Sequence, residues 1–530
     1  MNFEDLKSAA RRHIQAITAI HPTPALPRAF LSREARSTGL ASLVENLEVS
    51  ASARSTSQLF ENIIVLNVYL AEEGNQLERD YRHNRPDKDA AIFLREWVAG
   101  AVLPTEAFAE ASPYSIKQKA TLTPDEVAKY HAMSLSGILL LSRLENIEPL
   151  SKDESVVTIL TCLASFTDLN DPWTYSEAKD HACVLSEHYA ATANLSTILT
   201  GLLQARVKPL FAKTKNPAIT QQGRKAIDPL PSAATAHSDL DGETKPWKYR
   251  DAYIVTVFQW GLNHLDESSV PANWPLIIPP LLALIDDSST KYKVKGCSFL
   301  AIFLQKCPSR LLERTGLGEI FENAVMPCLM SLPSLTEEAE SLQLLKAAYP
   351  ALISLAFVRF PDEKHQPARI KALDKILRNG ILKGYAYAGE HVKIAEFLIN
   401  EMAVLVNELD VESIKHLKHV LPLLTGILAA PFATAYPPLL QASVKAVQTI
   451  IVADWPRIAH HRGEILKGLT VCWCRIGFEE AQCQELKQVQ ESIERAVQLL
   501  TCVLMGKVLL VEEYQTLIDS DSRLRDLLVV

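Results

Sequence analysis

Two adjacent carboxylates, Asp286 and Asp287, stand just before lysines at positions 291, 293 and 295 in the stretch PPLLALIDDSSTKYKVKGCSFLAIFL. Acids beside amines are residue types that could perform general acid–base catalysis. However, apolar residues at helical spacing precede and follow them, and the Asp, Ser and Thr residues in between bond free backbone N–H groups at helix starts. The pattern therefore favours a turn between two helices, with Asp286 and Asp287 as structural caps and Gly296 at a close helix contact.

A second candidate for chemistry is the segment CWCRIGFEEAQC, which holds Cys472, Cys474 and Cys483 and follows His460 and His461. Structural zinc sites usually pair cysteines in two separate clusters. On a helix, Cys472 and Cys474 would point about 200° apart. The spacing predicts no metal site here, and a metal-dependent hydrolase stays an alternative that stoichiometric metal analysis would decide.

Glycine pairs occur in RTGLGEIF, around Gly316, and in GYAYAG, from Gly384 to Gly389. A phosphate-binding loop also needs a lysine and a preceding strand, which RTGLGEIF lacks. The first segment is predicted to be a helix end and restart, and the second a loop between helices. No serine stands in a Gly-x-Ser-x-Gly context. The sequence predicts no catalytic, metal-binding or cofactor-binding residue, and a chain that is not an enzyme.

The elements around these candidates are expected to be helices. Aromatic residues make up 7% of the 530 residues and only 19 are glycine, a balance that favours helices over sheets. Thr123 is predicted to cap a helix that begins at Pro124 with acidic residues in its first turn. Apolar stripes at helical spacing recur, for example between Leu486 and Leu504. The predicted fold class is all-α.

Proline-containing segments suggest that helices repeat in pairs. IIPPLLALI, AVMPCLMSL and HVLPLLTGI place their prolines at Pro280, Pro327 and Pro422, so the first interval is 47 residues and the second, 95 residues, about twice that. HEAT-type helix pairs repeat every ~40–47 residues and must stack on their neighbours to bury their apolar faces. The sequence thus predicts a HEAT-like α-α superhelix, a solenoid of antiparallel helix pairs.

A proline-rich, weakly apolar stretch between residues 206 and 250 should interrupt the helices. Three parts are predicted: an N-terminal helical region (1–205), an irregular connector (206–250) and a HEAT-like repeat region (251–530). Lys245, Pro246, Trp247 and Lys248 at the end of the connector are the best candidate for protein binding. The alternative, weighed equally, is that Trp247 only anchors the connector to the following helix.

Charge and cysteine usage exclude several classes of protein. The formal net charge of −8 does not suit binding to a phosphate backbone. Nine scattered cysteines do not form a disulfide framework, and those at 162, 297, 328 and 502 are expected to be buried as small hydrophobes in a reducing compartment, the cytosol or nucleus. The start of the chain lacks the apolar run of a secretory signal. The uncharged stretch 420–444 contains four prolines, so two buried helices are expected there and not a membrane span.

From about residue 216 to residue 361 the chain resembles the family of the second Tel-two-interacting protein, a subunit of the Triple T (TTT) complex. The resemblance is carried by segments that include KPWKYRDAYIVTVFQWGL, NWPLIIPPLLALIDDSSTKYKVKGC, LLERTGLGEIFENAVMPCLMSLPS and AYPALISLA. The matching positions are Lys245, Pro246, Trp247, Lys248, Trp260, Trp274, Pro275, Pro279, Pro280, Asp286, Asp287, Gly296, Thr315, Gly316, Leu317, Pro327 and Pro333.

The resemblance implies a non-catalytic helical repeat subunit that assembles with Tel-two and the first Tel-two-interacting protein. It also implies a co-chaperone adaptor that acts with the Hsp-ninety chaperone and its R-two-TP partner on phosphatidylinositol-three-kinase-related kinases. TOR signalling, the DNA damage checkpoint and telomere maintenance follow from those clients, and cytoplasm and nucleus as the location. The alternative is a generic HEAT-repeat adaptor of another complex, of the transport or coat type.

Overall fold

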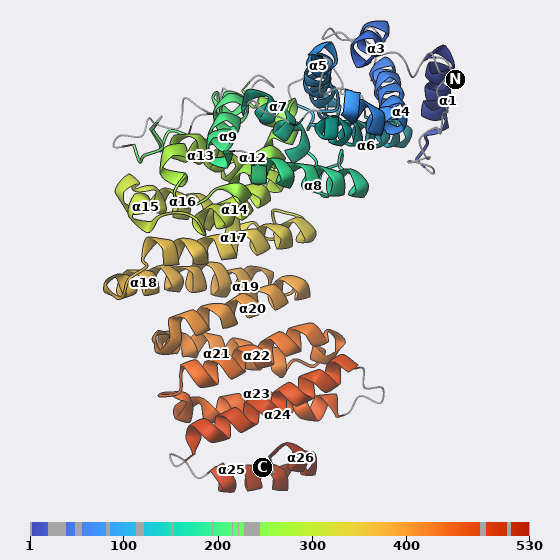
Figure 1. Cartoon of the computed structure of the whole chain (residues 1–530). Helices are drawn as coiled ribbons and strands as arrows, with labels where there is room; N and C mark the ends of the chain where they lie inside the picture. Colours follow the sequence, from blue (N-terminus) through green and yellow to red (C-terminus); the bar gives the residue numbers. More distant parts are fainter. Residues whose placement is uncertain are drawn as a thin grey trace. The chain divides into compact units, whose positions relative to one another are not determined.

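The computed structural model describes residues 3–19, 39–47, 56–80, 85–112, 121–147, 149, 153–192, 194–214, 216–220, 222–226, 244–477, 484–505 and 510–528. Within these ranges the regular structure is helical, and the one β-type pairing is an isolated antiparallel bridge between Ile219 and Lys225. The predicted all-α class is confirmed. Figure 1 shows the helices in chain order.

Contacts divide the chain into two compact units, residues 1–283 and 284–530, so that the division falls within α13 (Val270–Ile285). This division differs from the predicted boundaries, because the described parts of the 206–250 connector belong to the first unit. The three-part domain organisation stays a prediction.

The first unit is built from two rows of helices. Each helix packs on the next but one in the chain: α1, α4, α6 and α8 follow one another in one row, and α3, α5, α7 and α9 in the other. Contacts between α5 and α6 and between α7 and α8 join the rows, as expected of stacked helix pairs. The helices of this unit are α1 (Phe3–Ala16), α3 (Leu40–Asn46), α4 (Thr56–Asp80), α5 (Arg85–Ala101), α6 (Pro124–Ile147), α7 (Asp153–Ala164), α8 (Ser176–Thr192), α9 (Leu195–Leu202), α10 (Lys208–Phe211), α11 (Pro246–Tyr249), α12 (Tyr253–His264) and most of α13.

The predicted start of α6 is confirmed. The Thr123 backbone N–H donates to Glu126 Oε2 at 2.8 Å, and the Glu126 N–H donates to Thr123 Oγ1 at 3.3 Å. These reciprocal bonds form a capping box, which satisfies N–H groups that a helix start leaves without partners. The first bond also lowers the pKa of the Glu126 carboxyl.

The second unit is also built from two rows of helices. From α14 onwards, α14, α17, α20, α22 and α24 pack in succession in one row, and α21 packs on α23 in the other; Figure 1 shows these helices one after another. The helices are α14 (Thr290–Leu304), α15 (Ser309–Thr315), α16 (Leu317–Val325), α17 (Glu338–Arg359), α18 (Gln366–Ile376), α19 (Lys383–Ala388), α20 (Val392–Leu409), α21 (Leu417–Leu428), α22 (Pro437–Ala453), α23 (Ile458–Ile476), α24 (Gln484–Leu504), α25 (Leu510–Ser520) and α26 (Arg525–Leu528).

The acidic stretch is a turn between α13 and α14. Asp287 is 1% exposed, and its Oδ1 accepts a hydrogen bond from the Ser289 N–H at 2.9 Å just before α14 begins. Asp286 is exposed. A Cβ atom at Gly296 would lie 2.7 Å from the Ile285 backbone nitrogen, so only glycine allows α14 to approach the end of α13 this closely. These positions hold two helices together and form no reacting centre.

The repeat prolines are not equivalent in structure. Pro280 and Pro422 lie inside α13 and α21, whereas Pro327 lies beyond the end of α16, in a 3-10 turn (Met326–Met330). Proline suits the start of such a turn because its missing N–H has no role there. Stacked helix pairs are present, and the repeat interval of about 47 residues stays a prediction.

GYAYAG is not the predicted loop. A π-helical segment, Leu377–Leu382, runs directly into α19 (Lys383–Ala388). RTGLGEIF does contain a helix end and restart, because Gly316, at φ +70°, ends α15 and precedes α16.

The uncharged stretch 420–444 forms parts of two separate helices, α21 and α22, as expected. Among the described helices, α17 alone has the length and apolar content to cross a membrane. A core helix passes the same test, and α17 packs along α14 with its apolar residues largely buried.

The expected burial of cysteines holds at positions 162, 297 and 328 but is wrong for Cys502, which is exposed.

Candidate functional site

The predicted binding segment, Lys245 to Lys248, lies at the end of the connector. Trp247 is 0% exposed, its ring stacks on Phe211 with the centroids 5.0 Å apart, and its Nε1–H donates to Thr214 Oγ1 at 3.1 Å. Lys248 is 3% exposed, and its Nζ lies 3.6 Å from Glu110 Oε2. Pro246 is buried and Lys245 is half-buried.

Buried side chains present no atoms to a partner. The burial of Trp247 and Lys248 therefore favours the alternative in which this segment anchors the connector, here by clamping α10 and α11 together. A binding role for Lys245, Pro246, Trp247 and Lys248 stays a prediction.

The other two tryptophans singled out in the sequence, Trp274 and Trp260, are also buried. Trp274 is 3% exposed, and its Nε1–H donates to the Gly223 carbonyl at 2.7 Å. A Cβ atom at Gly223, which has φ +66°, would lie 3.1 Å from Trp274 Cδ1. The connector therefore docks on α13 at Trp274. Trp260, 4% exposed, instead lies on the wall of a groove.

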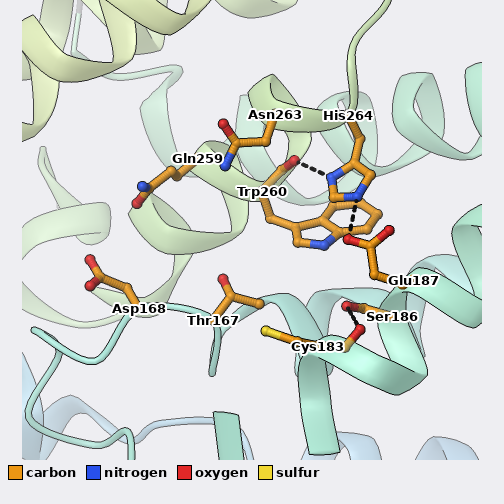
Figure 2. A pocket seen from close by; sticks show the side chains of 9 residues that line it. All are labelled: Thr167, Asp168, Cys183, Ser186, Glu187, Gln259, Trp260, Asn263 and His264. Carbon is orange, nitrogen blue, oxygen red and sulfur yellow. Dashed lines mark hydrogen bonds and ion pairs between the residues drawn. The ribbon is translucent and has the colours of Figure 1, made fainter. Parts of the chain in front are cut away.

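That groove, of about 400 Å³, lies in the first unit between α12, α8 and the turn that precedes α8 (Figure 2). One face of α12 and one face of α8 line it, because the contributing residues recur three to five positions apart on each helix. The lining residues are Gln259, Trp260, Asn263 and His264 from α12, Cys183, Ser186 and Glu187 from α8, and Thr167 and Asp168 from the turn.

His264 is the centre of the interactions in this groove. Its ring stacks on Trp260 with the centroids 4.0 Å apart, Nδ1 lies 2.9 Å from the Trp260 carbonyl oxygen, and Nε2 lies 3.0 Å from Glu187 Oε1. Figure 2 shows His264 joined to both neighbours. The ring therefore links α12 to α8. No local sequence pattern indicates this pair, because Glu187 lies 77 residues before His264.

The nucleophilic and basic side chains of the groove are engaged in local interactions or not activated. Burial raises the pKa of the Cys183 thiol, which disfavours the nucleophilic thiolate. The Ser186 hydroxyl donates to the Cys183 carbonyl at 3.0 Å, and both ring nitrogens of His264 are already engaged. In the described ranges, no three His, Cys, Asp or Glu residues are grouped to hold a metal ion; Cys483 lies outside the described residues. The groove offers polar contact surface between two helices.

More than half of the chain matches a known protein family. The sequence model of the Tti2 family matches residues 159–435, which is more than half of the chain. A relative from Saccharomyces cerevisiae, TEL2-interacting protein 2, is 25% identical over 310 residues, covering 55% of this chain and 72% of the relative.

Solved structures similar to the chain include a mutant of the karyopherin Kap121p, with a TM-score of 0.37, 13% identity and coverage of 92% of this chain. Importin beta, crystallised with ammonium sulfate, has a TM-score of 0.33 and 12% identity over 92% of this chain. The chain spans 44% and 60% of the lengths of these two proteins. The family match, which includes both helices of the Figure 2 groove and the α13–α14 turn, establishes that this chain belongs to the Tti2 family.

Proposed function

We propose that this chain is a non-catalytic scaffold subunit of a TTT-type co-chaperone complex. The observation that carries the proposal is the family match over residues 159–435, together with a relative that is named for its interaction with Tel2. Two rows of stacked helices support it, because such stacks act through extended surfaces that hold partners. The partners proposed are Tel2 and the first Tel2-interacting protein.

The finer part of the proposal concerns clients and location. In a TTT-type complex, this chain supports the maturation of phosphatidylinositol-three-kinase-related kinases with the Hsp90 chaperone. It then contributes to TOR signalling, the DNA damage checkpoint and telomere maintenance, and works in the cytoplasm and nucleus.

Affinity purification of the tagged full-length chain from its own cells, with mass spectrometry of the bound proteins, tests the complex. The expected result is co-purification of both Tel2 and the first Tel2-interacting protein in amounts similar to the bait. Absence of both overturns the proposal, and recovery of transport cargo or coat proteins in their place supports the generic HEAT-repeat adaptor.

Depletion of the chain tests the finer part. The protein levels of the related kinases should fall while their messenger RNA levels stay constant, because maturation acts on the newly made protein. Unchanged kinase levels, with the complex intact, would leave the subunit without the proposed role in kinase maturation.

A further inference from the structure

A surface groove in the second unit is lined by basic and apolar side chains. It has a volume of about 690 Å³, within the range of sites that bind small molecules and short peptides. Arg378, Leu382 and Tyr385 lie on one wall, and Lys418, His419 and Leu423 on the other. None of the described residues that line the groove is acidic. This is unusual in a chain with a formal net charge of −8.

Packing on the core holds the first wall in place. Arg378, Leu382 and Tyr385 share one helical face of the π-helical segment and α19. On the opposite face, a Cβ atom at Gly380 would lie 2.8 Å from both Leu329 Cδ1 and Tyr349 Oη. The inner face therefore fits tightly against the core, while Arg378 is exposed on the outer face.

The second wall is the 3-10 segment Asp410–His416, which runs into α21. Lys418 and His419 are exposed at the first turn of α21, and Leu423 is half-buried one turn later. The first wall packs on α20 through α19 and the π-helical segment, and the 3-10 segment contacts both α20 and α21. The groove is thus a built feature of the helix stack and not a gap between loose loops.

An acidic residue that contacts the groove lining, Asp374, is already engaged. Asp374 of α18 lies 2.7 Å from Lys415 Nζ through Oδ2 and 2.8 Å from His416 Nε2 through Oδ1. Lys415 also lies 3.7 Å from Glu412. Burial lowers the pKa of His416, and the hydrogen bond that its ring donates to the Asp374 carboxylate opposes this shift. In contrast, Arg378 and Lys418 form no ion pair with any residue in the described ranges.

We propose that this groove binds an acidic peptide segment of a partner protein, with carboxylates facing Arg378 and Lys418 and an apolar side chain against Leu382, Tyr385 and Leu423. Arginine can hold a carboxylate through two parallel N–H···O bonds. The apolar wall residues add burial that a purely electrostatic contact lacks. The proposal goes beyond membership of a TTT-type complex, because it states which kind of peptide the groove binds and does not depend on which subunit carries that peptide.

Fluorescence anisotropy with the full-length chain tests the proposal. The probes are labelled short peptides in which glutamates flank leucine or phenylalanine, and the same peptides with glutamine in place of glutamate. We expect saturable binding of the glutamate peptides that weakens as salt rises, since exposed charges are screened, and no saturable binding of the glutamine peptides. The variant Arg378→Glu/Lys418→Glu should weaken binding about tenfold or more, because attraction becomes repulsion at both rims.

The control variant is Arg310→Glu/Lys346→Glu, which makes the same change in net charge at two exposed positions of α15 and α17 outside the groove. It should bind the peptides like the parent chain, and thermal melting should show all three proteins equally folded. Should the groove variant melt lower, Arg378→Gln/Lys418→Gln takes its place in the binding assay.

Three results would overturn the proposal. One is no saturable binding of any glutamate peptide, and another is equal weakening by the groove and control variants. The third is tighter binding of a single-stranded oligouridylate than of the peptides, which would make the groove a nucleic-acid surface.

Discussion

Replacement of Trp247 by alanine should destabilise the connector and its helices by about 3–5 kcal/mol, the usual cost of truncating a buried tryptophan. The side chain has no exposed surface, stacks on Phe211 and donates to Thr214, so the change removes burial, an aromatic contact and a hydrogen bond together. Trp247→Phe keeps a ring against Phe211 but has no N–H donor. Its cost should be nearer ~1–2 kcal/mol, from the lost hydrogen bond and a small cavity.

Hydrogen exchange read by mass spectrometry measures this locally, which matters because a chain with two compact units does not unfold in one step. A loss of about 3 kcal/mol should speed exchange in peptides that cover residues 208–214 and 246–250 by more than about a hundredfold. Peptides from α22 and α23 should be unaffected.

Trp455→Ala is the matched control, because this substitution removes the same type of side chain from a surface position, where Trp455 is 49% exposed. Its cost should stay below about 1 kcal/mol. If Trp247→Ala instead left exchange and melting unchanged while binding to co-purified partners was lost, the anchoring role would be refuted and Trp247 would be an interface residue.

Four further substitutions, one of them a control, test the second unit. Leu300→Ala, at a 0% exposed position of α14, should lower stability by about 2–5 kcal/mol in a denaturant titration; an unchanged midpoint would place this face of α14 outside the core. Gly296→Ala should lower the free energy of unfolding by about 1–3 kcal/mol in the same assay, since the added Cβ would lie 2.7 Å from the Ile285 backbone nitrogen. Gly426→Ala is its control and should not destabilise the protein, because a Cβ atom there would have no other atom within 4 Å. Burial raises the pKa of Asp454 from 3.8 to about 6, so its contribution to stability is present below about pH 4 and is lost as the pH rises through about 6. Asp454→Asn should remove that loss, and parallel pH profiles of the two proteins' denaturation midpoints would contradict the assignment.

Local sequence rules predicted much of the fold. The α6 start could be predicted because a capping box is complete within four residues, Thr123 to Glu126. The turn at Asp286 and Asp287 could be predicted for the same reason, since helix-capping residues stand between two apolar stripes. Both depend on neighbours in sequence and on no distant contact.

The candidate sites could not be predicted in the same way, because their partners are distant in sequence. Trp247 lies in a basic, proline-rich segment, and such a segment suggests an exposed side chain. Its burial depends on Phe211 and Thr214, which lie more than 30 residues earlier in the chain. His264 and Glu187 meet because α8 and α12 both pack on α7. Hydrophobic periodicity identifies which face of a helix is buried but does not identify the helix that covers it.

GYAYAG shows how packing can reverse a local preference. Glycine costs about 1 kcal/mol in a helix interior relative to alanine, so Gly380, Gly384 and Gly389 favour a loop when the sequence is considered alone. In the structure, Gly380 lies against Leu329 and Tyr349, and a Cβ at Gly384 would contact Leu398 at 3.4 Å. The absence of a side chain at Gly380 lets the π-helical segment lie close to α17, and that contact outweighs the lost propensity, whereas the space at Gly384 would accept a Cβ atom. The same close approach leaves Arg378 and Tyr385 on the outer face, where they form a wall of the basic groove. Gly380, which favours a loop when the sequence is considered alone, therefore allows the close packing of the wall that carries Arg378.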